Sequence, residues 1–106
     1  MTALRHPDWY LISEQRFRRR AAVTWTRQVF RGETFIVISD RVTGQHMRLG
    51  QRAQDLWELL DGKRTAQQLW DHLSTRPASA PTQGELVEWI MQLVSSGYAL
   101  SDHDLD

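Results

Sequence analysis

The alternation of apolar and polar positions in the first half of the chain predicts three β-strands. Residues 22–30 ("AVTWTRQVF") alternate between the two kinds of side chain, and β-branched and aromatic residues are frequent among them. Turns at Gly32 and Gly44 separate this segment from two further strand-like segments, residues 34–39 ("TFIVIS") and 45–49 ("QHMRL"). We therefore expect an antiparallel three-stranded meander.

The second half of the chain has the repeat of amphipathic helices. Apolar residues at positions 53, 56, 57 and 60 predict a first helix, which stops at Gly62 within a tight turn over residues 61–64. Thr65 and Gln68 have the spacing of a capping box, which predicts the start of a second helix. Because each helix is short, we expect Trp57 and Trp70 to lie in a shared core near the helix–helix interface.

A third helix follows a loop over residues 74–81 that is rich in helix-breaking residues. Thr82 and Glu85 form a second capping box at its start, and Gly97 marks its end. Trp89 lies outside the inward-facing apolar stripe of this helix. The segment "YALS" (98–101) adds a short closing strand, a wing.

The order of elements predicts a small α+β domain, in which a three-stranded antiparallel β-meander precedes three α-helices. We expect an N-terminal arm over residues 1–21, the folded domain over residues 22–101 and an acidic tail over residues 102–106. The 106 residues suffice for one core, and 41% hydrophobic with 25% charged residues is typical of a globular chain.

The net charge of zero conceals an uneven distribution. Residues 1–48 carry nine arginines against four acidic residues, a charge of +5, and residues 49–106 carry four basic against nine acidic residues, a charge of −5. Much of the basic excess lies in "RFRRR". We interpret this run as a solvated face and, as the functional alternative, as a contact with anionic lipid through Arg16, Arg18, Arg19 and Arg20.

No pattern of catalytic residues stands out. The sequence has no cysteine, no HExxH and no glycine-rich phosphate loop, and its four histidines are scattered. We therefore predict that the chain is not an enzyme and holds no metal and no cofactor. The absence of cysteine, of a long apolar run and of a signal-peptide core favours a cytoplasmic location, at the inner face of the membrane if the basic run binds lipid.

Strands followed by three helices also describe winged-helix DNA-binding proteins. Against this alternative, the loop before the third helix is longer than the turn of a DNA-reading helix pair. The third helix also carries Glu85 and Glu88 but no basic residue, whereas phosphate neutralisation dominates DNA affinity. We therefore expect no nucleic-acid partner.

The central block "MRLGQRAQDLWELLDGKRTAQQLWDHL" is similar to that of PqqD-like proteins, the peptide-recognition family of ribosomal peptide modification. The residues that carry the likeness are Leu60, Asp61, Gly62, Arg64, Thr65, Leu69 and Trp70. The flanking segments further resemble the cytosolic N-terminal domain of bacterial site-2-protease-type membrane zinc metallopeptidases. There the matching residues are Trp9, Tyr10, Arg31, Gly32, Asp40, Gly44, Pro81, Thr82, Glu85 and Leu93.

This resemblance implies a winged-helix-like, non-catalytic adaptor domain that binds a peptide. In such domains the peptide adds as a strand to the third strand and docks on the third helix, since an open sheet edge offers main-chain hydrogen bonds. Carried over to this chain, the peptide-binding residues are Gln45, His46, Met47, Arg48, Trp89, Gln92, Leu93 and Ser96.

A second interpretation stays open beside peptide binding. In it the chain is a regulatory or structural cytosolic domain of a membrane metallopeptidase, which contacts the membrane part or anionic lipid, or forms a homodimer. Because the chain lacks the HExxH of the protease, it inherits no catalytic role from that resemblance.

Overall fold

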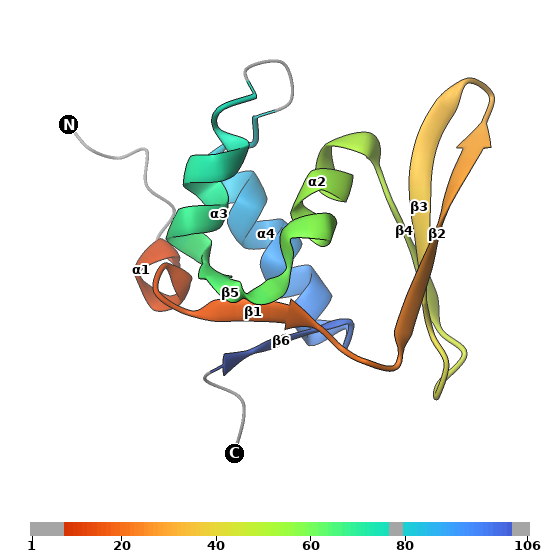
Figure 1. Cartoon of the computed structure of the whole chain (residues 1–106), viewed down its shortest axis with the longest axis horizontal. Coiled ribbons are helices and arrows are strands. Elements are labelled where there is room, and N and C mark those ends of the chain that lie inside the picture. The colour runs from red at the N-terminus through yellow and green to blue at the C-terminus, as the bar shows by residue number, and fades with distance from the viewer. Residues whose placement is uncertain (1–7, 77–79, 103–106) are drawn as a thin grey trace.

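The structure, a computed structural model, describes residues 8–76 and 80–102 and confirms an α+β fold. Within these residues the chain forms four helices and two three-stranded antiparallel sheets (Figure 1). The helices are α1 (Trp9–Ile12), α2 (Gln51–Leu59), α3 (Ala66–Leu73) and α4 (Gln83–Ser95). The strands are β1 (Arg16–Arg19), β2 (Val23–Phe30), β3 (Glu33–Asp40), β4 (His46–Leu49), β5 (Asp61–Thr65) and β6 (Ala99–Ser101).

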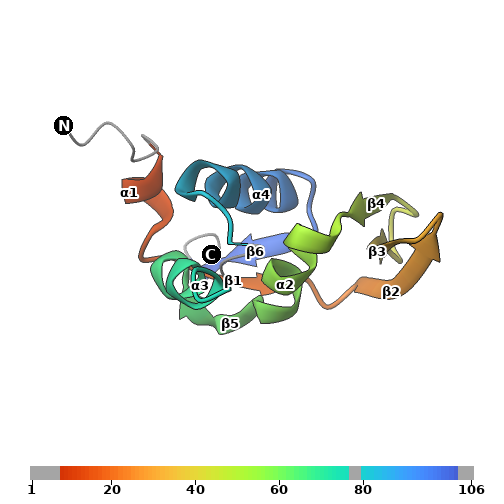
Figure 2. The same ribbon diagram turned by 90° about the horizontal axis from the view of Figure 1, so that it is seen from above.

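The larger sheet has the order β2-β3-β4 and is the predicted meander. Arg31 and Gly32, both with positive φ, connect β2 to β3 in a two-residue hairpin, and Gly44 has φ +78° in the next turn. One face of the sheet packs its Ile36 and Ile38 against the core. Helix α2 lies between this sheet and the α3–α4 pair (Figures 1 and 2).

An N-terminal arm was expected over residues 1–21, but the described part of it, residues 8–21, belongs to the fold, because β1 lies in the smaller sheet with the order β5-β1-β6. Residues 1–7 lie outside the described part. Strand β1 is the centre of this sheet, and the side chains of Trp9, Ile12 and Phe17 are buried in the core. The sequence did not predict strand β1 because three of its four residues are arginines, and Phe17 is the one buried side chain between them. Of the predicted acidic tail, Asp102 accepts a hydrogen bond from the backbone N–H of Arg16, and residues 103–106 lie outside the described part.

Strand β5 likewise replaces the tight turn that was expected over residues 61–64. Helix α2 ends at Leu59, and Leu60 is its C-cap residue. The chain is extended from Asp61 onward, and Asp61 pairs with Arg18 of β1. Gly62 has φ +81°, and a Cβ atom there would lie 3.2 Å from the Cβ of Arg18. The glycine therefore permits close contact between neighbouring strands rather than a reversal of the chain.

The two capping boxes and the closing strand β6 are confirmed. Trp57 is fully buried and Trp70 packs against the core, but each indole pairs with another tryptophan. Trp57 lies edge-on to Trp25 of β2 with ring centroids 5.7 Å apart, and Trp70 lies edge-on to Trp9 of α1 at 5.3 Å. These contacts tie β2 and α1 to the helices. The winged-helix-like arrangement stays a prediction.

Candidate functional site

Strand β4 is an edge of the larger sheet, because β3 is its only neighbour among the described residues. The backbone N–H of Asp40 donates to the carbonyl of Gln45 at 2.8 Å, which fixes the hydrogen-bonding phase of this antiparallel pair. Bonded and non-bonded pairs alternate, so Met47 and Leu49 also bond to β3. The backbone N–H and C=O groups of His46 and Arg48 therefore point to the open side.

A hollow of about 450 Å³ lies beside this edge. Its lining comes from two places that are far apart in the sequence, the start of β4 and the end of α4: Gly44, Gln45, His46, Met47, Ser96 and Tyr98. Four of the eight predicted peptide-binding residues, Gln45, His46, Met47 and Ser96, are thus brought together. The sequence analysis missed Tyr98 and Gly44. The signal for Tyr98 was Gly97, whose φ of +82° turns the chain after α4 ends and leads it into β6 beside β1.

The predicted face of α4 is only partly available. Gln92 is exposed and Ser96 is half-buried, but Leu93 is 2% exposed and belongs to the core. Trp89 is half-buried beneath Arg52, whose guanidinium carbon lies 5.7 Å from the centre of the indole. Leu93 is therefore wrong as a residue that contacts a peptide, because its side chain is buried in the core.

Arg52, which the sequence analysis did not select, clamps the start of α2 onto α4. Its guanidinium binds both carboxylate oxygens of Glu85 at 2.8 Å and also the carbonyl of Ala80. Arg52 and the backbone N–H of Thr82 hold the pKa of Glu85 down at about 2. The clamp covers Trp89 and joins two residues that are more than thirty positions apart in the chain, and no local sequence pattern marks such a pair.

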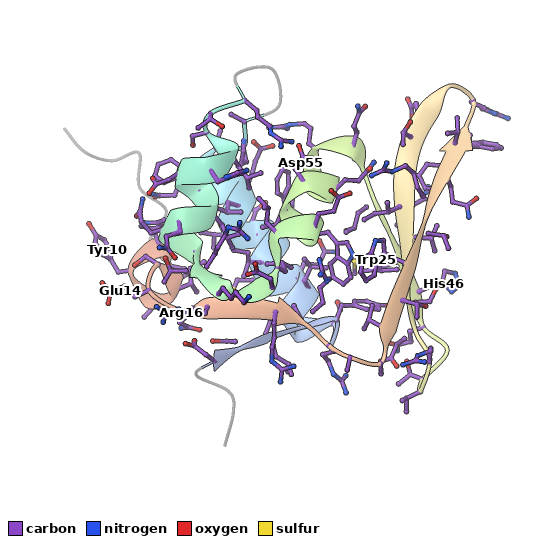
Figure 3. All side chains as sticks on the ribbon, viewed as in Figure 1. Tyr10, Glu14, Arg16, Trp25, His46 and Asp55 are labelled. Carbon is purple, nitrogen blue, oxygen red and sulfur yellow. The ribbon has the colours of Figure 1, made fainter. Side chains whose placement is uncertain are left out.

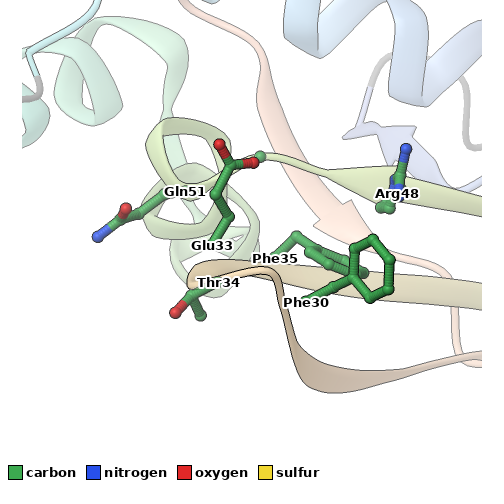
Figure 4. A pocket seen from close by; sticks show the side chains of 7 residues that line it. Phe30, Glu33, Thr34, Phe35, Arg48 and Gln51 are labelled. Atoms are coloured by element: carbon green, nitrogen blue, oxygen red, sulfur yellow. The ribbon is translucent and has the colours of Figure 1, made fainter.

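Arg48 points to the other face of the sheet. Its guanidinium carbon lies 5.1 Å from the centre of the Phe35 ring, and the two residues share a second hollow, of about 430 Å³, with Phe30 and Glu33 (Figure 4). In Figure 3, His46 lies on this outer side, whereas Trp25 lies between the sheet and α2. Side chains of β4 thus alternate between the α4 side of the sheet, where Met47 lies, and the outer side, where Arg48 lies. The backbone edge of β4 runs between these two faces.

Asp40 holds the turn that leads into β4. Its carboxylate accepts hydrogen bonds from the backbone N–H groups of Val42 and Thr43 and lies 3.8 Å from the guanidinium of Arg20. The hydrogen bond from Val42, with the help of Arg20, lowers the pKa of Asp40. Burial, with a smaller effect of the Asp40 charge, raises the pKa of the neighbouring Tyr98. Asp40 thus fixes the turn before β4 and lies close to Tyr98, which lines the hollow.

The basic run is largely occupied by contacts within the molecule. Arg19 donates to the carbonyls of Trp57 and Glu58 at the end of α2 and stacks on Trp25. Arg20 donates to the carbonyl of Gly97. Arg16 lies 3.9 Å from the Asp102 carboxylate, and Arg18 packs on Gly62. Three of the four guanidinium groups thus have polar partners within the molecule, and membrane contact stays a prediction.

Within residues 8–76 and 80–102, no three histidine, aspartate or glutamate side chains come together so that they could hold a metal ion. None of the helices described here is long and apolar enough to cross a membrane.

Comparisons of the chain with protein-family models, with curated proteins and with solved structures find no match. The resemblance to PqqD-like proteins therefore stays a prediction, and the geometry around β4 is what supports a functional proposal.

Proposed function

We propose that this chain is a peptide-binding domain, in which an extended segment of a partner adds to β4 as a fourth strand. The observation that carries the proposal is the open edge at His46 and Arg48 beside a hollow that the end of α4 helps to form. Main-chain hydrogen bonds supply affinity in strand addition, and pockets for alternate side chains supply specificity. The β4 edge offers both.

The two faces of the sheet define the chemistry of the ligand. Alternate side chains of an added strand point to opposite faces. On the α4 side they meet Met47, Tyr98 and Ser96, a partly apolar lining that favours one apolar side chain. On the outer side they meet Arg48, which favours an acidic residue as its cross-strand neighbour. We infer an extended segment in which an apolar residue alternates with an acidic one.

The contribution of α4 is narrower than the resemblance implies. Ser96 lines the hollow and Gln92 is exposed one helical turn before it, whereas Trp89 lies half-buried beneath Arg52, which is bound to Glu85. The basic run has partners inside the molecule, so the described contacts favour peptide binding over the alternative of a membrane-contacting structural domain.

A peptide selection with two matched variants tests the proposal. Linear peptides would be selected on the whole chain from a random displayed library, and a selected peptide would be synthesised and titrated. Ser96→Arg fills the hollow, whereas Ser95→Arg introduces the same side chain at a neighbouring exposed position that does not line it.

We expect Ser96→Arg to weaken binding about tenfold or more, the factor that corresponds to ~1.4 kcal/mol, and Ser95→Arg to leave it unchanged. Far-ultraviolet circular dichroism of both variants shows that they fold. A selection that yields no binder, or binders that Ser96→Arg does not disturb, would refute peptide binding at this edge.

A further inference from the structure

The larger sheet has a second open edge, β2, that peptide binding at β4 does not use. Strand β2 is eight residues long, and its pairing with β3 runs through all eight positions without a bulge. Only Val23 is buried. Trp25 is 41%, Val29 70% and Phe30 58% exposed, so large apolar side chains line this strand.

The hairpin fixes which backbone groups of β2 are open. In a two-residue hairpin the flanking residues, Phe30 and Glu33, form a hydrogen-bonded pair, and the bonded pairs then alternate along the strand. The even-numbered residues of β2 therefore bond to β3. The N–H and C=O groups of Trp25, Arg27 and Val29 point to the open side.

Edge strands of natural proteins are usually protected against pairing by charges, proline, bulges or shortness. Strand β2 contains no proline, no glycine and no bulge. Its one charged residue, Arg27, is bound to Glu58 of α2 at 2.8 Å. Of the common devices that prevent pairing with another strand, β2 retains only the charge of Arg27.

We propose that β2 pairs with β2 of a second copy of the chain, antiparallel, around a two-fold axis at Thr26. This register brings the open backbone groups of Trp25 opposite those of Arg27 of the partner, as hydrogen bonding requires. It also places Thr24 opposite Gln28 and Val23 opposite Val29, so that in these pairs polar meets polar and apolar meets apolar, whereas Trp25 meets the charged Arg27.

Two observations favour a second copy over an unrelated partner. The open backbone groups allow a register with the axis at Thr26, in which the like charges of the two Arg27 residues are not opposite each other, Thr24 meets Gln28 and Val23 meets Val29. The chain also has a formal net charge of zero, so no overall repulsion separates two copies. Since one strand pair buries less than a standard interface, the dimer dissociates on dilution.

Charge substitutions at the axis test both the dimer and its register. Thr26 is exposed on the outer face, so Thr26→Lys and Thr26→Glu leave the core untouched but place two like charges directly opposite each other. Thr24→Lys adds the same charge on the same face, where it meets Gln28 of the partner rather than another lysine. Sedimentation velocity from micromolar to millimolar concentration measures the association.

The wild type forms a dimer, and each Thr26 variant alone associates about fivefold more weakly or worse. An equal mixture of the two Thr26 variants associates as strongly as the wild type or more strongly. Thr24→Lys changes the dimer affinity little. A wild type that is monomeric throughout the series overturns the proposal. Thr26 variants that associate like the wild type, or a mixture that associates no better than its components, overturn it as well.

Discussion

The two open edges of one sheet differ in length, surroundings and charge. Strand β4 has four residues, begins beside the end of α4, and carries Arg48 on its outer face. Strand β2 has eight residues in unbroken register, and its only charge is bound to Glu58. The short β4 edge lies beside a hollow, so it selects its partner through a few side chains. The long β2 edge runs unbroken over eight residues, so it selects a partner whose sequence fits along the whole strand.

The difference teaches that an open edge alone does not define a binding site. Register and partner are set by what lies above and below the edge. At β4 these are the hollow and the sheet face with Phe35, both parts of this molecule. At β2 the matching surface is supplied by a second copy. The two associations therefore respond to different substitutions, and the following experiments separate them.

The largest effect is expected from proline at β4. Met47→Pro removes an N–H that bonds to β3 and leaves an acceptor unsatisfied, so we expect about 1–3 kcal/mol less stability in urea unfolding. His46→Pro removes only an outward N–H and should leave stability nearly unchanged while it weakens peptide binding about fivefold to tenfold. Equal losses of stability in the two variants would mean that the hydrogen-bonding phase of β4 is wrong.

Proline in β2 probes the other edge. Arg27→Pro deletes one outward N–H in each copy, and the loss of two intermolecular hydrogen bonds should weaken the dimer about tenfold. Arg27→Ala is the matched control, because it removes the same exposed ion pair with Glu58 but keeps the N–H. Sedimentation at several concentrations compares them, and a dimer that tolerates Arg27→Pro as well as Arg27→Ala would exclude β2.

Reversal of one charge should change the ligand preference of β4. Arg48→Glu places a carboxylate opposite the acidic position of the bound strand, so we expect about fivefold weaker binding of an acidic peptide and stronger binding of its lysine counterpart. Titration of both peptides at low and high salt measures this. The dimer should be unaffected, and an unchanged preference would remove Arg48 from the site.

The smallest effect concerns pH. Because the pKa of Glu85 is lowered from 4.5 to about 2, its ionised form stabilises the fold fully above pH 4.5, and this contribution is lost as the pH falls toward 2. Glu85→Gln should lower the melting temperature by a few degrees at neutral pH and hardly at all near pH 2. Glu88→Gln, at an exposed position of the same helix, is the control.

Much of the fold followed from local patterns, and the errors have physical causes. Alternation over residues 22–30 and the capping boxes at Thr65 and Thr82 act through neighbouring residues, so the sequence displays them. Strands β1 and β5 were missed because arginines and a glycine form them, and only their contacts across the chain make them strands. Polar partners at positions 57, 58 and 97 satisfy guanidinium groups that look solvated in the sequence.

The candidate site was predictable to a similar extent. The β4 edge follows from the meander, because the last strand of a meander lies at the edge. The face of α4 does not follow from helical spacing alone, since Leu93 is buried in the assembled core and the cover over Trp89 comes from Arg52 of α2. Arg52 stands at the start of a different helix, and only the fold brings it to Glu85.

Amide hydrogen exchange, resolved by residue, tests the central claim that the two edges bind different partners. On addition of a selected peptide at low protein concentration, the amides of His46 and Arg48 should become protected while that of Met47, already bonded to β3, changes little. On concentration without peptide, protection should instead rise at Trp25, Arg27 and Val29. Protection of the same edge in both experiments, or of neither edge in either, would contradict the account.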